Sequence, residues 1–244
     1  MPFPTYTGRG VTADRVVKIV APVRREALNA ADHVAEALGS RGDADPDPGR
    51  GNRQEEVRVM AGDRGLVYIA IFAAIIGALG VVPGLTLPFG GGVPITLQSL
   101  GIMLAGVALG PVRGAAAVLI FLGLVAAGLP LLAGGRGGTE VFFGPSGGFL
   151  IGFPIAAFAC GVVMRVLKHT AVFPASLAAA TIGGIGVLYA VGVPGMAAFE
   201  GLTMQKAALL SLVYLPGDLI KAFGVAVIAE AISRGRPDAL MSRL

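Results

Sequence analysis

The sequence predicts an all-α integral membrane protein, a six-transmembrane-helix bundle, and three observations support this fold class. Hydrophobic residues make up 55% of the 244 residues and charged residues only 14%, whereas about a quarter of the residues in a soluble domain are charged. Six apolar runs follow one another along the chain. The basic residues between these runs favour one side of a membrane.

The charged residues are concentrated before the first apolar run. Residues 1–65 hold ten of the 19 Lys and Arg residues and ten of the 15 Asp and Glu residues. We therefore predict a polar N-terminal extension over residues 1–62 and a transmembrane domain over residues 63–244. An amphipathic helix is expected over 23–38, followed by a flexible linker in GSRGDADPDPGRGNR. No apolar stretch of the usual signal-peptide length opens the chain.

Apolar length defines the six predicted spans, since a bilayer core of about 30 Å needs roughly 20 helical residues. The spans are expected near residues 66–82, 96–109, 112–127, 148–167, 173–193 and 207–232. Because the second and third runs are short, we predict two helices joined by a tight turn at Gly110 and Pro111. Pro216 lacks an amide hydrogen and is expected to kink the sixth span.

Basic residues near the spans predict the topology. If the N-terminus is cytoplasmic, eight basic residues fall on the cytoplasmic side, and only Arg136 and Lys206 fall on the outer side. The sequence therefore predicts a multi-pass plasma-membrane protein with both termini in the cytoplasm. The eight cytoplasmic residues are Arg58, Arg64, Arg113, Arg165, Lys168, Arg234, Arg236 and Arg243.

Two Gly- and Pro-rich loops are expected on the outer side, PGLTLPFGGGVP before the second span and LPLLAGGRGGTEVFFGPSGG before the fourth. Their backbone groups cannot lie unsatisfied in lipid. We therefore expect both loops to fold over the outer end of the bundle, where they would form a substrate lid or a binding wall.

Asp218 and Lys221 are the most informative polar residues. They stand three residues apart near the middle of the sixth apolar run, and this spacing places them on one helix face. Ionisable residues at such depth usually line a polar cavity or pair with a partner. The pair is therefore either a ligand site or a neutralised packing contact.

Three further polar residues lie at predicted outer helix ends. Thr96 and Gln98 open the second span, and Ser146 precedes the fourth. Each is suited either to cap its helix or to hydrogen-bond a neutral polar ligand. The capping interpretation is strongest for Thr96 and the ligand interpretation is strongest for Gln98.

Small residues repeat at four-residue spacing in the first span, at Ala70, Ala74 and Ala78. Such a strip allows close helix approach, either within the bundle or with another membrane subunit. The single cysteine, Cys160, lies in an apolar run and is interpreted as a helix-packing residue. The sequence therefore predicts neither a disulfide framework nor a cysteine metal site.

Four segments follow one another along the chain, VPITLQSLGIMLAGVALGPVRG, GLPLLAGGRGG, GPSGGFLIGFPIAAF and PGDLIK. In this order they resemble the BioY family, the substrate-binding S components of energy-coupling factor (ECF) biotin transporters, and the likeness covers residues 66–235. The resemblance implies a six-helix bundle that captures biotin from outside. It also implies partners, namely a transmembrane coupling protein and two cytoplasmic ATPases.

The resemblance also implies roles for individual residues. Asp218 and Lys221 would belong to the biotin site, and Ala70, Ala74 and Ala78 would dock the coupling protein. Lys221 could pair with the biotin carboxylate, while Asp218 and Gln98 could bind the ureido group. Phe149 and Leu132 would enclose the apolar part of biotin. The loop residue Arg136 is either a carboxylate partner or a solvated side chain.

Other functional classes find less support in the sequence. The two histidines, His33 and His169, lie far from Asp218, and no phosphate-binding loop is present, so neither an enzyme nor ATP hydrolysis by this chain is predicted. No cofactor, metal or nucleic acid is expected. Two alternatives remain, an S component for a different vitamin and a stand-alone transporter that uses Asp218 and Lys221 as an ion relay.

Overall fold

The computed structural model describes residues 48–82, 96–236 and 239–243, and residues 59–244 form one compact unit. Within the described ranges, every regular element is a helix, apart from an isolated bridge between Leu132 and Arg136. The all-α prediction is therefore confirmed for this part of the chain. The predicted helix over 23–38 and the first outer loop lie outside the described residues.

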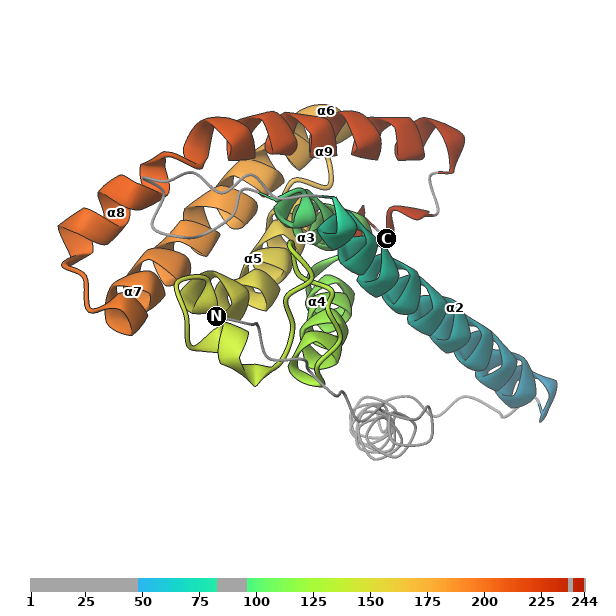
Figure 1. The fold of residues 1–244 in the computed structure, drawn as a ribbon. Coiled ribbons are helices and arrows are strands. Elements are labelled where there is room, and N and C mark those ends of the chain that lie inside the picture. The colour runs from blue at the N-terminus through green and yellow to red at the C-terminus, as the bar shows by residue number, and fades with distance from the viewer. Residues whose placement is uncertain (1–47, 83–95, 237–238, 244) are drawn as a thin grey trace, which may run out of the picture. The chain divides into compact units, whose positions relative to one another are not determined.

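The helices follow the predicted apolar runs in order (Figure 1). Two short 3₁₀ helices, η1 and η4, and one π-helix, η2, accompany the α-helices. The elements are α2 (Pro48–Val81), α3 (Gln98–Leu109), α4 (Pro111–Ala126), η1 (Thr139–Phe142), α5 (Gly147–Val166), α6 (Val172–Ala179), η2 (Ala180–Val187), α7 (Leu188–Glu200), α8 (Met204–Leu212), α9 (Leu215–Gly235) and η4 (Met241–Arg243).

Several of these helices have the length and composition of membrane spans. The helices over 147–166 and 172–200 are each long and apolar enough to cross a membrane. Helices α8 and α9 provide a third span if the bent pair is counted as one. The shorter apolar helices cover Gly65–Val81, Gln98–Leu109 and Pro111–Ala126. The described residues thus show a polytopic helical membrane protein.

Two element boundaries differ from the predictions. Helix α2 begins at Pro48, inside the expected linker, because proline suits the first turn of a helix and good helix formers follow at residues 54–56. The sixth run forms two helices bent by 55° at residues 213–214 instead of one kinked span. Pro216 lies in the first turn of α9, where its missing amide hydrogen costs no helical hydrogen bond.

The turn between α3 and α4 agrees with the prediction. Gly110 joins the two helices with φ of 83°, a left-handed conformation that glycine adopts without steric cost. Pro111 then begins α4. The second and third apolar runs are therefore two separate helices.

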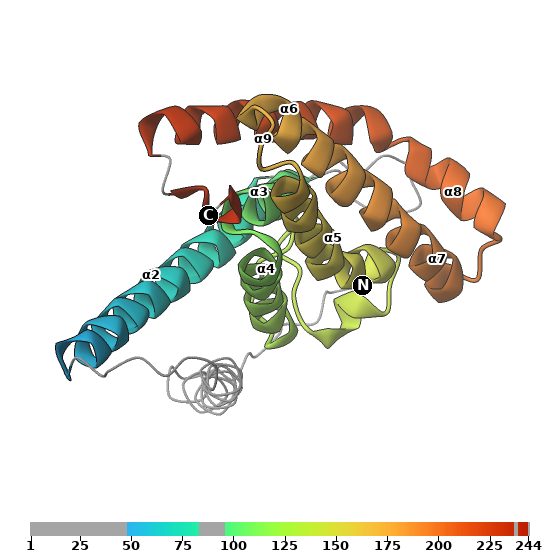
Figure 2. The same ribbon diagram turned by 180° about the vertical axis from the view of Figure 1, so that it is seen from behind.

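Helix α3 lies at the centre of the packing. All of its residues except Leu100 are buried, and it contacts α4, α5 and α9. Figure 1 shows α9 running beside α6, and Figure 2 shows α5 between α4 and α7. Large side chains such as Phe121, Ile102 and Met164 fill the core between these helices. Cys160 is also buried in this core, beside Gly183, in agreement with its predicted packing role.

The C-terminal residues close one end of the described bundle. Leu240 is buried in the main core, and the Arg243 guanidinium donates to the backbone carbonyls of Leu167 at 3.0 Å and Lys168 at 2.9 Å. These carbonyls directly follow α5, and the Leu167 carbonyl also accepts the Thr170 N–H at 3.0 Å. Arg113, at the start of α4, contacts Met241 Sδ at the same end.

Candidate ligand site

Asp218 and Lys221 form a buried ion pair at the start of α9. Lys221 Nζ lies 2.8 Å from Asp218 Oδ1, and the two residues are 8% and 6% exposed. The predicted shared face is therefore confirmed. Asp218 lies in the first turn of α9, just after the break at residues 213–214, so the pair stands near the middle of a broken span if α8 and α9 are counted as one.

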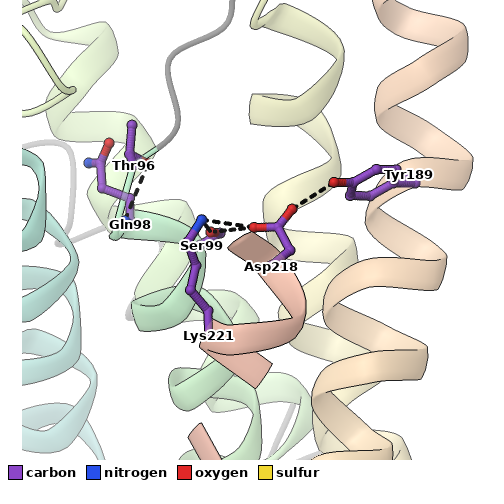
Figure 3. Close-up of polar contacts among 6 residues, drawn as sticks. All are labelled: Thr96, Gln98, Ser99, Tyr189, Asp218 and Lys221. Carbon is purple, nitrogen blue, oxygen red and sulfur yellow. Dashed lines mark hydrogen bonds and ion pairs between the residues drawn. The ribbon is translucent and has the colours of Figure 1, made fainter. Parts of the chain in front are cut away.

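Ser99 and Tyr189, which were not predicted as site residues, complete a polar network around this pair (Figure 3). Ser99 Oγ donates to Asp218 Oδ1 at 3.3 Å and accepts from Lys221 Nζ at 3.0 Å. Tyr189 donates its hydroxyl to Asp218 Oδ2 at 2.7 Å. The network joins α3, α7 and α9, so helices far apart in sequence meet at one ion pair.

A signal for both residues existed in the sequence. Ser99 directly follows Gln98, a predicted site residue, and Tyr189 places a hydroxyl group in a largely apolar run. A buried tyrosine hydroxyl usually finds a hydrogen-bond partner. The sequence could not show that this partner is Asp218, because the two residues lie in separate helices.

Thr96 and Gln98 have structural contacts in the described chain. Thr96 lies one residue before Leu97, the N-cap of α3, and its Oγ1 accepts the backbone N–H of Gln98, the first residue of the helix, at 3.3 Å. Gln98 is 2% exposed, and its amide nitrogen donates to the carbonyls of Leu131 at 3.0 Å and Ile76 at 3.4 Å. Gln98 therefore ties the loop between α4 and α5 to α2 and α3.

Ser146 occupies the N-cap position of α5, but its side chain makes no capping hydrogen bond. Its Oγ is buried without a hydrogen-bond partner among the described residues. The capping interpretation is thus not supported by a contact. The ligand interpretation of Ser146 stays a prediction.

Phe149 and Leu132 line different parts of the bundle. The Phe149 ring contacts the Tyr189 ring edge to face, with centroids 5.9 Å apart, so Phe149 adjoins the polar network. Leu132 is buried in the main core, and its N–H donates to the Arg136 carbonyl at 3.0 Å. This bond closes a tight turn in the loop between α4 and α5.

Arg136 is half-buried in this turn. Its Nε donates to the Ala133 carbonyl at 3.2 Å, and burial lowers the pKa of the guanidinium below its ordinary value. Arginine nevertheless keeps its charge in proteins. Arg136 is therefore a loop-stabilising cation in the described structure, and its pairing with a ligand carboxylate stays a prediction.

The small-residue strip of α2 faces away from its neighbours. Ala70, Ala74 and Ala78 are exposed, whereas Ala73 and Gly77 on the other face are buried. The strip therefore does not pack against the helices of the described bundle.

The described residues also contain no group of three or more His, Cys, Asp or Glu side chains that could hold a metal ion.

The fold and the site together define a class of protein. Apolar helices, two of which are long enough to span a membrane, enclose a buried ion pair between α3, α7 and α9. The molecule is therefore a polytopic helical membrane protein with a polar site between its helices. Residues 53–238 match the family model described as the BioY family, and the chain belongs to the BioY family.

Individual relatives agree with this assignment. The biotin transporter BioY of Rhodobacter capsulatus is 45% identical over 190 residues, which cover 74% of this chain and 99% of the relative. The biotin transporter BioY of Rhizobium etli is 49% identical over 182 residues, which cover 71% and 95%. The family predicted from the four sequence segments is thus confirmed.

A solved structure shows the same fold. The crystal structure of the S-component for biotin from an ECF-type ABC transporter superimposes with a TM-score of 0.67. It is 34% identical to this chain, and the alignment covers 71% of this chain and 93% of that structure.

Proposed function

We propose that this chain is the biotin-binding S component of an ECF-type importer and that biotin binds beside Asp218 and Lys221. The observation that carries the proposal is the buried ion pair between α3, α7 and α9 in a chain of the BioY family. A buried charged pair is costly in a membrane bundle. A ligand that uses both charges accounts for its presence.

The chemistry of biotin suits the residues around the pair. The ureido ring offers N–H donors and one carbonyl acceptor, and the carboxylate is an anion. Lys221 Nζ and Asp218 Oδ1 lie only 2.8 Å apart, so both would bind the same end of biotin. Asp218 would accept a ureido N–H, and Lys221 would donate to the ureido carbonyl in place of the carboxylate expected from the sequence. Gln98 contributes its Oε1 as an acceptor, since its amide nitrogen is bonded to Leu131 and Ile76.

Apolar and smaller polar residues complete the proposed site. Phe149, which contacts Tyr189, would pack against the bicyclic ring, and the buried Leu132 would enclose the valeryl chain. Ser146, whose hydroxyl is buried without a partner among the described residues, would supply a hydrogen bond. Thr96 would act at the edge of the site. Biotin is the transported ligand, and no cofactor is proposed.

The proposed topology is six membrane spans with both termini in the cytoplasm. It is supported by the basic residues at one end of the bundle. Arg243 donates to the carbonyl of Lys168, Arg113 contacts Met241, and Arg165 lies beside Gly110. Basic residues near helix ends mark the cytoplasmic side.

The proposed partners are a transmembrane coupling protein and two cytoplasmic ATPases, which would supply the energy for uptake. The exposed strip of Ala70, Ala74 and Ala78 is the proposed docking face for the coupling protein. Small residues let two helix backbones approach closely. This chain would then bind and carry the ligand, while its partners perform ATP hydrolysis.

Uptake of labelled biotin tests the proposal in cells that lack their own biotin transporter. Cells that produce this chain with an energy-coupling module should accumulate label, and unlabelled biotin but no other vitamin should compete. No accumulation of labelled biotin in the presence of a working energy-coupling module would point to a different vitamin. Uptake without any ATPase that collapses with an uncoupler would instead indicate an ion-coupled carrier.

A further inference from the structure

The polar network uses most of the hydrogen-bonding capacity of the ion pair. An ionised carboxylate has about four acceptor positions and an ammonium group has three N–H donors. Oδ1 of Asp218 accepts from Lys221 and Ser99, and Oδ2 accepts from Tyr189. Within the described residues, one acceptor position on Oδ2 and one N–H of Lys221 stay open.

Tyr189 is itself held in place from two sides. Its ring contacts Phe149 edge to face, with an interplanar angle of 87°. On the other side, its hydroxyl donates to Asp218 Oδ2, as Figure 3 shows.

We propose that Tyr189 and Ser99 are positioning residues that hold Asp218 and Lys221 with one acceptor and one donor open toward the ligand. Ser99 fixes Oδ1 against the ammonium group, and Tyr189 fixes the direction of Oδ2. A ligand N–H that binds Oδ2 shares this oxygen with the Tyr189 hydroxyl. The inference rests on the proposed function, because the ligand used to test it is biotin.

The first test compares biotin affinities of the purified full-length chain in detergent. Tyr189→Phe keeps the ring against Phe149 and removes only the hydroxyl, and it should weaken biotin binding about tenfold, since hydrogen bonds to charged groups are the stronger ones. Ser99→Ala should weaken binding about threefold to tenfold. The control variants Tyr68→Phe and Ser233→Ala lose hydroxyls outside the network and should bind like the wild type.

The second test follows the Tyr189 hydroxyl directly. The chain has four tyrosines and no tryptophan, so its emission comes from tyrosine. A phenol bonded to a carboxylate emits weakly, and biotin carries no aromatic ring. Biotin should therefore change the tyrosine emission of the wild type and of Tyr68→Phe, but not that of Tyr189→Phe. A merely structural tyrosine would not give this signature.

The outcomes separate the two proposals. A wild-type chain that does not bind biotin overturns the proposed function. Biotin binding that is equal in the wild type, Tyr189→Phe and Ser99→Ala overturns only the positioning roles. If the tyrosine emission of the wild type does not change when biotin saturates the chain, the ligand does not share Asp218 Oδ2 with the Tyr189 hydroxyl. If Tyr189→Phe does not fold, the proposal is tested by the biotin affinity of Ser99→Ala and by the tyrosine emission of the wild type.

Discussion

At the scale of single residues, the cost of a buried charge dominates the site. Asp218 and Lys221 neutralise each other at 2.8 Å, and Ser99 and Tyr189 each donate a further hydrogen bond to the carboxylate. Removing one member of such a pair leaves the other charge buried and uncompensated, whereas removing both charges is often neutral. A double variant that removes both charges should therefore regain the stability that a single variant loses, without regaining ligand binding.

The single variant Lys221→Met should lower the free energy of unfolding by about 3 to 5 kcal/mol. The double variant Asp218→Asn, Lys221→Met should recover most of this loss and still bind no biotin. Thermal unfolding in detergent measures the stability. Glu230 and Arg234 form an exposed pair on the same helix at 3.0 Å, so Arg234→Met should change stability by less than about 1 kcal/mol. Equal effects of Lys221→Met and Arg234→Met would contradict this account.

At the scale of the helices, glycine sets how closely α5 and α7 pack. A Cβ on Gly148 would lie 2.6 Å from Gly195 Cα and 2.7 Å from the Gly192 carbonyl oxygen. Both obstacles are backbone atoms, which cannot move aside without separating the helices. The crossing also carries Phe149 and Tyr189 into contact, so helix packing and the site depend on each other.

Gly148→Ala should therefore lower the thermal unfolding midpoint, with a loss of about 1 to 3 kcal/mol from overpacking, and should weaken biotin binding. Gly123→Ala is the matched control, because nothing lies within 4 Å of its Cβ position in α4. This control should be neutral or slightly stabilising, since alanine favours helix more than glycine does. Gly148→Ala with wild-type stability would show that α5 and α7 can separate freely.

Helix existence could be predicted from sequence, but helix interruptions could not. Apolar runs and the Gly110–Pro111 signal correctly gave α3, α4 and α5. The expected kink at Pro216 is a 55° break before it, at residues 213–214. The π-helix over 180–187 was not predicted from the sequence; its Gly183 and Gly184 lie close to Cys160 and Met103, contacts that form only in the folded chain.

At the scale of the whole molecule, the exposed face of α2 is available for a partner. Ala70, Ala74 and Ala78 are exposed, and Ile71 and Ile75 beside them are 45% and 37% exposed. In a bilayer, lipid or another helix covers such a face. The strip can therefore be altered without disturbing the site beside Asp218.

Ala74→Phe should leave biotin binding by the purified chain unchanged and should abolish uptake that depends on the energy-coupling module. The bulky ring would prevent the close helix approach that small residues allow. Leu119→Phe, at a 57% exposed position on α4, should affect neither property. Normal uptake by Ala74→Phe would place the docking face elsewhere.

The site was only partly predictable from the sequence, for a physical reason. Asp218 and Lys221 stand out because charges are rare in apolar runs, and their pairing follows from helical spacing. Ser99 and Tyr189 join them only through tertiary packing of α3 and α7 against α9. The two contacts of the Gln98 amide with the Leu131 and Ile76 carbonyls likewise depend on the folded loop.

The most direct measurement of the central claim is calorimetric titration of the purified, biotin-free chain with biotin, beside Asp218→Asn, Lys221→Ala and the control Arg234→Ala. We expect saturable binding by the wild type and the control, and binding weakened at least tenfold by each substitution in the buried pair. A well-folded wild type that binds no biotin, or pair variants that bind it as tightly as the wild type, would contradict the proposed function or the proposed site, respectively.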